Sequence, residues 1–142
     1  MKGENWKIFL GLFLVILLRI HNAWVYPPYW GVDANGHCQY VEILCSQGRL
    51  PLPQEGWSAY HPPLYYVLSS LPPRLLGWPE PLLCAKLLSM FSSFALMILS
   101  YFCIRAVYPR WALLGMLIVG VFPNDVLYSC VCYNIEIGRA HV

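Results

Sequence analysis

Charged residues are scarce in this sequence, and their scarcity argues against several classes of protein. Lys, Arg, Asp and Glu make up 11% of the 142 residues, less than half of the roughly 25% that is typical of soluble proteins. The net charge of +2 provides no dense cationic surface to neutralise a row of phosphates, which argues against nucleic-acid binding. Hydrophobic residues reach 58%, whereas disordered chains combine low hydrophobicity with high net charge. The composition therefore predicts an all-α membrane protein.

The placement of the cysteines does not indicate a secreted, disulfide-bonded domain. Six cysteines in a short chain would suit such a domain. Four of the six lie in apolar runs, where a buried structural thiol is the better interpretation. The sequence also has neither internal repeats nor a low-complexity tract. We therefore expect the fold to depend on apolar helices rather than on covalent cross-links.

The first of three predicted transmembrane helices covers about 7–25. This segment is long enough for the roughly 30 Å hydrocarbon core only if Arg19 and His21 lie near the far interface or face protein. Lys2 and Lys7 precede the apolar run, so the positive-inside rule places the N-terminus in the cytoplasm. No A-x-A-like cleavage site follows, and we predict an uncleaved span rather than a signal peptide.

Two further spans are predicted at about 82–106 and 111–133. Arg105 and Arg110 flank the short turn between them, which makes this turn cytoplasmic. Asp125 follows a proline by two residues inside the last span, and a carboxylate is costly in lipid. We expect Asp125 to contact polar groups of the bundle, to approach the outer surface or to lie in a kink that the proline opens.

The loop 26–81 then lies outside the membrane or at its outer interface. The first span leads out of the cytoplasm and the second leads back to it, so segment 62–77 cannot also cross the membrane. The prolines of this segment favour a short re-entrant or interfacial helix. Asp33 precedes residues 34–47 and is the predicted N-cap of an amphipathic juxtamembrane helix. We expect the apolar stripe of this helix to lie on the membrane surface; the stripe consists of Tyr40, Val41, Leu44 and Cys45.

The C-terminal residues look foreign to the rest of the chain. Ile-Gly-Arg-Ala-His-Val, at 137–142, is encoded by one reading frame of a common sequencing adapter, ATC GGA AGA GCA CAC GTC. The adapter has AG before that ATC, and a GAG codon for Glu136 fits it. We therefore expect 136–142 to be derived from an adapter and 1–135 to be the N-terminal part of a longer membrane domain. A genuine C-terminal tail is the alternative.

Polar residues of the outer loop form three short motifs. They are Trp-Gly-Val-Asp-Ala-Asn-Gly-His at 30–37, Gly-Arg-Leu-Pro-Leu-Pro at 48–53, and Tyr-His-Pro-Pro-Leu-Tyr-Tyr at 60–66. Asp33 and His37 are four residues apart, so on a helix that starts there both lie on one face near its N-terminus. Because the helix dipole and free N–H groups favour an anion at that end, the first motif indicates a phosphate site.

This order of motifs resembles the multi-spanning C-type glycosyltransferases that use polyprenyl-phosphate sugar donors, the superfamily of protein O-mannosyltransferases and lipid A aminoarabinose transferase. The resemblance covers residues 5–134: an acidic residue after the first span, a juxtamembrane helix, and then a Pro-Pro-Leu-Tyr-Tyr-like segment. Two features depart from the pattern. Asp33 is followed by Ala34 where many members have Asp-Glu, and a later outer Asn-Asp is represented only by Asn134 and Ile135. With the second carboxylate missing, little supports the divalent metal that some relatives use, and no cofactor is expected.

The resemblance implies transfer of a hexosyl or pentosyl group, with inversion, to a lipid, glycan or protein acceptor. The reaction would take place on the extracytoplasmic face of a bacterial-type cytoplasmic membrane, or on the lumenal face of an endoplasmic reticulum. By resemblance, Asp33 is the catalytic residue that accepts or orients the acceptor's proton. The candidates for binding substrate phosphate are His37, His61, Arg49 and Lys86, and the two histidines are also candidates for carrying protons. Without its remaining spans the chain is expected to be inactive.

Structural roles compete with each of these assignments. One alternative is that Asp33 caps the helix and has no catalytic role. Another is that Arg49 and Lys86 are interfacial residues that place their charges in the headgroups. Tyr66 and Trp57 are most simply aromatic-belt residues. A zinc site is disfavoured because its candidate ligands lack the usual spacing; they are Asp33, His37, Cys38 and Glu42.

Two other functions compete with the enzyme. One is a small, non-catalytic membrane protein that binds or scaffolds a partner through the outer loop. The other is a transporter, in which Arg19 and Asp125 would be charges of the pathway.

Overall fold

The computed structural model describes residues 5–31, 33–129 and 131, and within them it contains helices and no strand. The all-α prediction is therefore confirmed for the described part of the chain. The elements are α1 (Asn5–Val25), α2 (Ala34–Gln47), η1 (Pro53–Glu55), η2 (Trp57–Tyr60), α3 (Leu64–Leu76), α4 (Pro81–Val107), η3 (Pro109–Trp111), α5 (Ala112–Gly120) and α6 (Pro123–Tyr128).

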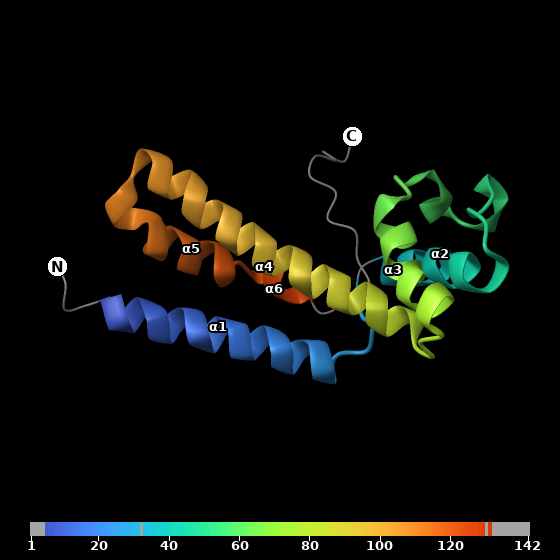
Figure 1. Cartoon of the computed structure of the whole chain (residues 1–142), viewed down its shortest axis with the longest axis horizontal. Coiled ribbons are helices and arrows are strands. Elements are labelled where there is room, and N and C mark those ends of the chain that lie inside the picture. The colour runs from blue at the N-terminus through green and yellow to red at the C-terminus, as the bar shows by residue number, and fades with distance from the viewer. Residues whose placement is uncertain (1–4, 32, 130, 132–142) are drawn as a thin grey trace.

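The helices form an elongated bundle with a helical cap at one end. Figure 1 shows α1, α4 and α5 running side by side, while α2, α3, η1 and η2 gather beside the N-terminal end of α4. The start of α1 and the turn between α4 and α5 lie at the opposite end of the bundle (Figure 1). The loop residues 26–81 and the arginines of the α4–α5 turn are thus at opposite ends of the molecule.

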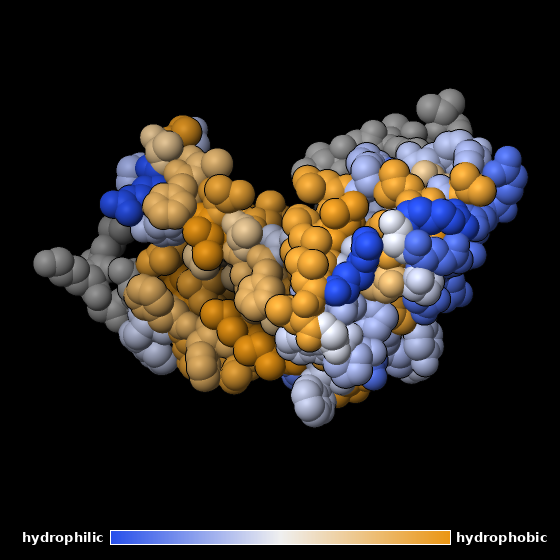
Figure 2. Space-filling view, turned by 45° about the vertical axis from the view of Figure 1, so that its right-hand side comes forward, coloured by the Kyte–Doolittle hydropathy of each residue, from blue (hydrophilic) through white to orange (hydrophobic). Residues whose placement is uncertain are grey.

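Among the residues that the structure describes, two helices are long and apolar enough to cross a membrane: Trp6–Val25 of α1 and Pro81–Val107 of α4. At 1.5 Å per residue they extend about 30 Å and 40 Å. Only 22% and 33% of their apolar windows are buried, which is little for the core helices of a soluble protein. Large apolar side chains such as Phe13 and Phe91 are exposed instead, at 56% and 61%. Figure 2 shows this apolar surface over the bundle, with hydrophilic residues towards its two ends.

The third predicted span, 111–133, is divided in the described residues. Helix α5 ends at Gly120, and α6 begins only at Pro123. Between them Phe122 has an extended backbone, with φ −62° and ψ 122°. Proline accounts for this break, because its ring disfavours a helical conformation in the preceding residue and it has no N–H to continue the helix. Residues 130 and 132–133, and the tail expected at 136–142, lie outside the described residues.

The helix predicted at 34–47 is present as α2, but its apolar stripe does not lie on a membrane surface. Tyr40, Val41 and Leu44 are buried at 4% exposure or less, in a core shared with Tyr66 of α3 and Ala85 of α4. A stripe with a 3.6-residue period fits any apolar partner, and here the partners are α3 and the start of α4. Helix α2 therefore belongs to a small protein core at the end of the bundle. The short helix expected within 62–77 is α3.

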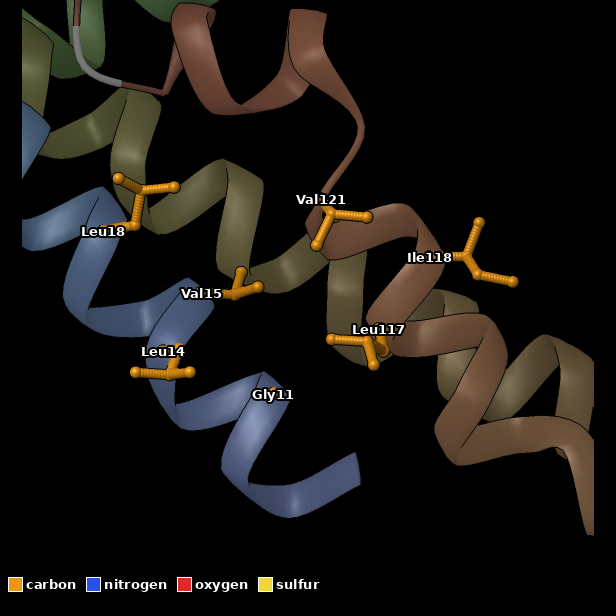
Figure 3. Close-up of a pocket in the computed structure, with 7 residues that line it drawn as sticks. All are labelled: Gly11, Leu14, Val15, Leu18, Leu117, Ile118 and Val121. Carbon is orange, nitrogen blue, oxygen red and sulfur yellow. The ribbon is translucent and has the colours of Figure 1, made fainter. Parts of the chain in front are cut away.

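The bundle core is small, and an apolar groove opens beside it. Leu12, Val15 and Met97 join α1 to α4. A Cβ atom at Gly120 would lie 2.8 Å from Cε of Met97 and 3.2 Å from Cγ1 of Val15, so this glycine allows α5 to approach closely. The groove has a volume of about 450 Å³ between α1 and α5 (Figure 3), and it is lined by Gly11, Leu14, Val15, Leu18, Leu117, Ile118 and Val121.

Candidate functional site

The outer-loop histidines meet in a buried cluster. Nδ1 of His37 lies 2.6 Å from the hydroxyl oxygen of Tyr66, and Nδ1 of His61 lies 3.2 Å from the same oxygen. The two imidazole rings are 5.2 Å apart between centroids. Trp57 presents its ring at steep angles to both of them, at 5.3 Å and 5.1 Å. The sequence placed His37 and His61 in one loop, and the fold joins them through one phenol. We call His37, Trp57, His61 and Tyr66 the histidine cluster.

Local sequence explains how three short elements meet at this cluster. His61 precedes Pro62, which favours the extended backbone that it adopts, with φ −76° and ψ 150°. This extended residue separates η2 from α3 and brings His61 within reach of Tyr66. On α2, Gly36 has no side chain, and a Cβ there would lie 2.6 Å from ring carbons of Trp57. Close approach of Trp57 to α2 therefore depends on Gly36.

Aromatic packing holds Tyr66 rigidly. Its ring is fully buried and stacks on Tyr40 of α2, with 3.8 Å between centroids and an angle of 8°. Tyr65, the next residue, donates a hydrogen bond of 3.0 Å to the carbonyl oxygen of Ala85 on α4. Burial raises the pKa of the Tyr40 phenol above its ordinary value, so Tyr40 stays protonated at neutral pH. Because Tyr66 is buried, the expectation that it belongs to an exposed aromatic belt is wrong. Trp57, for which the same role was expected, is 47% exposed.

Asp33 stands at the N-cap position of α2 but does not cap it. Its backbone is left-handed, with φ 65° and ψ 0°, and its side chain makes no capping hydrogen bond. An N-cap residue normally has a β-region backbone that aims its oxygen at the free N–H groups, and the left-handed conformation removes that alignment. The predicted cap is therefore wrong. The carboxylate is exposed at the start of α2, one helical turn before His37.

Arg49 forms an ion pair in the outer loop. Its guanidinium donates to both carboxylate oxygens of Glu55, over 2.7 Å and 2.6 Å. The N–H of Leu52 donates to the same carboxylate over 2.6 Å. These hydrogen bonds lower the pKa of Glu55 to about 2, with the Arg49 bond as the largest cause. This arrangement closes the segment from Arg49 to Glu55, and the structure shows the predicted phosphate ligand engaged with a carboxylate.

Lys86 is buried near the start of α4, with 6% of its surface exposed. Its ammonium donates a hydrogen bond to the carbonyl oxygen of Tyr26, just beyond the end of α1. The lysine thus links the chain after α1 to α4. It lies on the loop side of the bundle, the side on which the sequence placed it.

Arg19 of α1 is 0% exposed and forms a buried ion pair inside the bundle. Its guanidinium binds the carboxylate of Asp125 in α6. It also donates to Oγ of Ser93 over 2.9 Å and to the carbonyl oxygen of Gly120 over 2.5 Å. Ser93 in turn donates to Asp125 over 3.0 Å. Of the two predicted positions for Arg19, the structure supports the one facing protein, and Asp125 makes the expected polar contact within the bundle.

The sequence pattern did not reveal this pairing. The two partners lie 106 residues apart along the chain, and no local pattern connects residues so distant. Each had a local signal, because a charge in an apolar run requires a partner. Pairing the two unmatched charges of the first and third runs would have found the contact.

The described residues include no group of three or more His, Cys, Asp or Glu side chains that could hold a metal ion. The four described cysteines form no disulfide with one another: Cys38 and Cys84 are buried, Cys45 is half-buried and Cys103 is exposed. The chain matches no family model, no curated protein and no solved structure. The histidine cluster and its surroundings are therefore interpreted from their own geometry and from the resemblance described above.

Proposed function

We propose that this chain forms part of a multi-pass membrane glycosyltransferase. The enzyme takes a sugar from a polyprenyl-phosphate donor and transfers it to a lipid, glycan or protein acceptor on the extracytoplasmic face of a bacterial-type cytoplasmic membrane. The observation that carries the proposal is the histidine cluster. It joins His37 and His61, two of the candidate substrate ligands, one helical turn from the exposed carboxylate of Asp33.

The arrangement of charge supports a multi-pass topology. Most residues in the apolar windows of the two long helices are not buried inside the bundle. Arg105 and Arg110 lie near the end of the bundle opposite the outer loop (Figure 1). Positive charge favours the cytoplasmic side of a membrane, so the opposite end, with the histidine cluster, is the extracytoplasmic end. In this proposal α5 and α6 together take the place of a third span.

Two further features suit a lipid-linked phosphate. The groove between α1 and α5 is lined only by aliphatic side chains and Gly11 (Figure 3), which is suitable for a hydrocarbon chain. Lys86 supplies a positive charge where the bundle meets the loop. A lipid tail along the bundle and a phosphate at its outer end would place the sugar beside the histidine cluster.

The buried ion pair argues for this proposal over a transporter. Transport charges must be able to exchange partners or ligands along a pathway. Arg19 instead donates to three separate oxygens, which belong to Asp125, Ser93 and Gly120. A charge fixed in this way suits a structural link between helices.

A transfer assay tests the proposal. The complete open reading frame is expressed, and its membranes are incubated with polyprenyl-phosphate donors that carry radiolabelled mannose, glucose or aminoarabinose. We expect label to leave at least one donor, and Asp33→Asn to reduce the rate by about 10²-fold or more. Glu42→Gln is the matched control, because Glu42 is an exposed carboxylate further along the same helix. No transfer from any donor would refute the function, and an unchanged rate in Asp33→Asn would refute the role of Asp33.

A further inference from the structure

Trp57 is the exposed member of the histidine cluster. It is 47% exposed, whereas the other three members are 7% exposed or less. An indole is a large apolar surface, and leaving it in water forgoes the favourable free energy of burial. The cluster therefore presents one large aromatic surface at the loop end of the bundle.

The chain around Trp57 is tied to α2 on both sides. Oγ of Ser58 donates a hydrogen bond of 2.8 Å to the carbonyl oxygen of Gly36 on α2. The side-chain amide of Gln39, also on α2, donates a hydrogen bond of 2.8 Å to the carbonyl oxygen of Glu55. These bonds hold η1 and η2 to α2 within two residues of the indole, so the backbone that carries the ring is fixed.

The indole ring itself is seated on α2. A Cβ atom at Gly36 would lie 2.6 Å from Cε2 and Cζ2 of Trp57 and 2.8 Å from Nε1, so the absence of a side chain at Gly36 leaves room for the ring. The rings of His37 and His61 meet the indole at interplanar angles of 82° and 71°. Trp57 is therefore both exposed and fixed in orientation.

A fixed, exposed indole suits a ligand better than a membrane interface. An interfacial tryptophan acts by partitioning its ring among the headgroups and needs no defined orientation. A ring that binds a flat ligand gains from being held in advance, because less ordering is then lost on binding. The hydrogen bonds and the glycine seat of Trp57 are features of the second kind.

A sugar ring has the chemistry to occupy this surface. A pyranose carries hydroxyl groups around its rim and C–H groups on its faces. The hydrogens of these C–H groups are slightly positive, and they pack against the negative face of an aromatic ring. In the proposed function the lipid phosphate at the outer end of the bundle places the donor's sugar beside the histidine cluster, which includes Trp57.

We propose that the indole of Trp57 is the platform on which the sugar ring of the polyprenyl-phosphate donor stacks. This inference rests on the proposed function. Trp57 forms and breaks no covalent bond; it binds the pyranose and orients it beside the histidine cluster. Removing the indole should therefore weaken binding of the sugar and leave binding of the lipid phosphate unchanged.

Affinity measurements in lipid nanodiscs separate the sugar from its lipid carrier. The product of the complete open reading frame is titrated with the polyprenyl-phosphate donors of the transfer assay and with polyprenyl phosphate that carries no sugar. We expect the unmodified protein to bind at least one donor about tenfold more tightly than the bare lipid phosphate. Trp57→Leu should lose about two- to tenfold in affinity for that donor, with unchanged affinity for the bare lipid phosphate.

Two further variants serve as controls. Trp78→Leu removes a tryptophan of similar exposure, 43%, from the same outer loop, and it should leave both affinities unchanged. Trp57→Phe retains a smaller aromatic face and should lose less affinity for the donor than Trp57→Leu. Unchanged donor affinity in Trp57→Leu would overturn the inference. An equal loss for the donor and the bare lipid phosphate would overturn it too, because that result indicates an interfacial anchor.

Fluorine nuclear magnetic resonance of the 5-fluorotryptophan-labelled protein observes the ring without removing it. Trp57→Phe and Trp78→Phe each remove one signal and so assign it. We expect the donor to shift the Trp57 signal more than the bare lipid phosphate does, and the Trp78 signal to respond alike to both. A Trp57 signal that responds alike to both would overturn the inference. This measurement decides the question if Trp57→Leu does not fold.

The inference and the proposed function can fail separately. Sugar-dependent affinity that is lost in Trp57→Leu, with no transfer from any donor, would refute the transferase and support the platform. Transfer by Trp57→Leu with an unchanged KM for the donor would overturn the platform and support the transferase.

Discussion

Removing one partner of the buried ion pair is the most direct test of how the bundle is held together. Arg19 is 0% exposed and Asp125 is 7% exposed, so either charge left alone stays in a region of low polarity. Loss of one partner from such a pair costs about 3–5 kcal/mol, mainly because the remaining charge is buried without compensation. We therefore expect Asp125→Leu and Arg19→Met each to lower the free energy of unfolding by about that amount.

The double variant separates this charge penalty from simple loss of contacts. Arg19→Met with Asp125→Leu leaves no buried charge at this position and nearly fills the space, and replacement of a buried pair by apolar residues is often close to neutral. We expect the double variant to recover most of the loss, which gives a coupling energy of about 3 kcal/mol or more. Ser93 and the Gly120 carbonyl also lose a donor in this variant, so recovery is expected to be incomplete.

Equilibrium unfolding in detergent micelles, followed by tryptophan fluorescence, measures these energies. Arg105→Met is the matched control, because Arg105 is exposed on α4, where its guanidinium donates a hydrogen bond of 3.3 Å to the hydroxyl of Tyr101 one turn earlier. Its effect should lie within about 0.5 kcal/mol. A cost for Asp125→Leu no larger than that of this control would contradict a buried charge penalty. A double variant that loses the sum of the two single effects would contradict it as well.

Three further predictions concern the outer loop. The hydrogen bond from Arg49 is the largest cause that lowers the pKa of Glu55 to about 2. The ionised Glu55 therefore stabilises the folded loop fully at pH values above its ordinary pKa near 4.5, and this stabilisation is lost as the pH falls towards 2. A ¹³C titration should show the low midpoint, and Arg49→Gln should return it towards 4.5; a midpoint near 4.5 in the unmodified protein would contradict the ion pair. Gly36→Ala places a methyl group 2.6 Å from the ring of Trp57, and should cost about 1–3 kcal/mol in unfolding and shift the tryptophan emission. Unaltered stability and emission would show that the ring can move aside. A cysteine at Gln54 should react with a membrane-impermeant maleimide in intact cells, whereas labelling only after lysis would reverse the proposed topology.

Local patterns in the sequence determined the helical class and most of the helix positions. The length and hydropathy of the first two predicted spans correspond to α1 and α4, and the periodic stretch at 34–47 corresponds to α2. The break before Pro123 also has a local origin, because a proline restricts the residue before it. These features depend on neighbours within a few residues, so they can be read from the order of residues alone.

Tertiary structure alone decided which partners these elements meet. The apolar stripe of α2 suited a membrane surface and a protein core equally well, and only the positions of α3 and α4 made it a core. Arg19 required a partner, but its contact with Asp125 depends on how α1 packs against the broken third run. Tyr66 had the sequence signature of an aromatic-belt residue, yet it bridges two histidines from different elements. Hydropathy records how much a side chain favours water, whereas hydrogen bonds and ion pairs depend on distances that only the packed helices define.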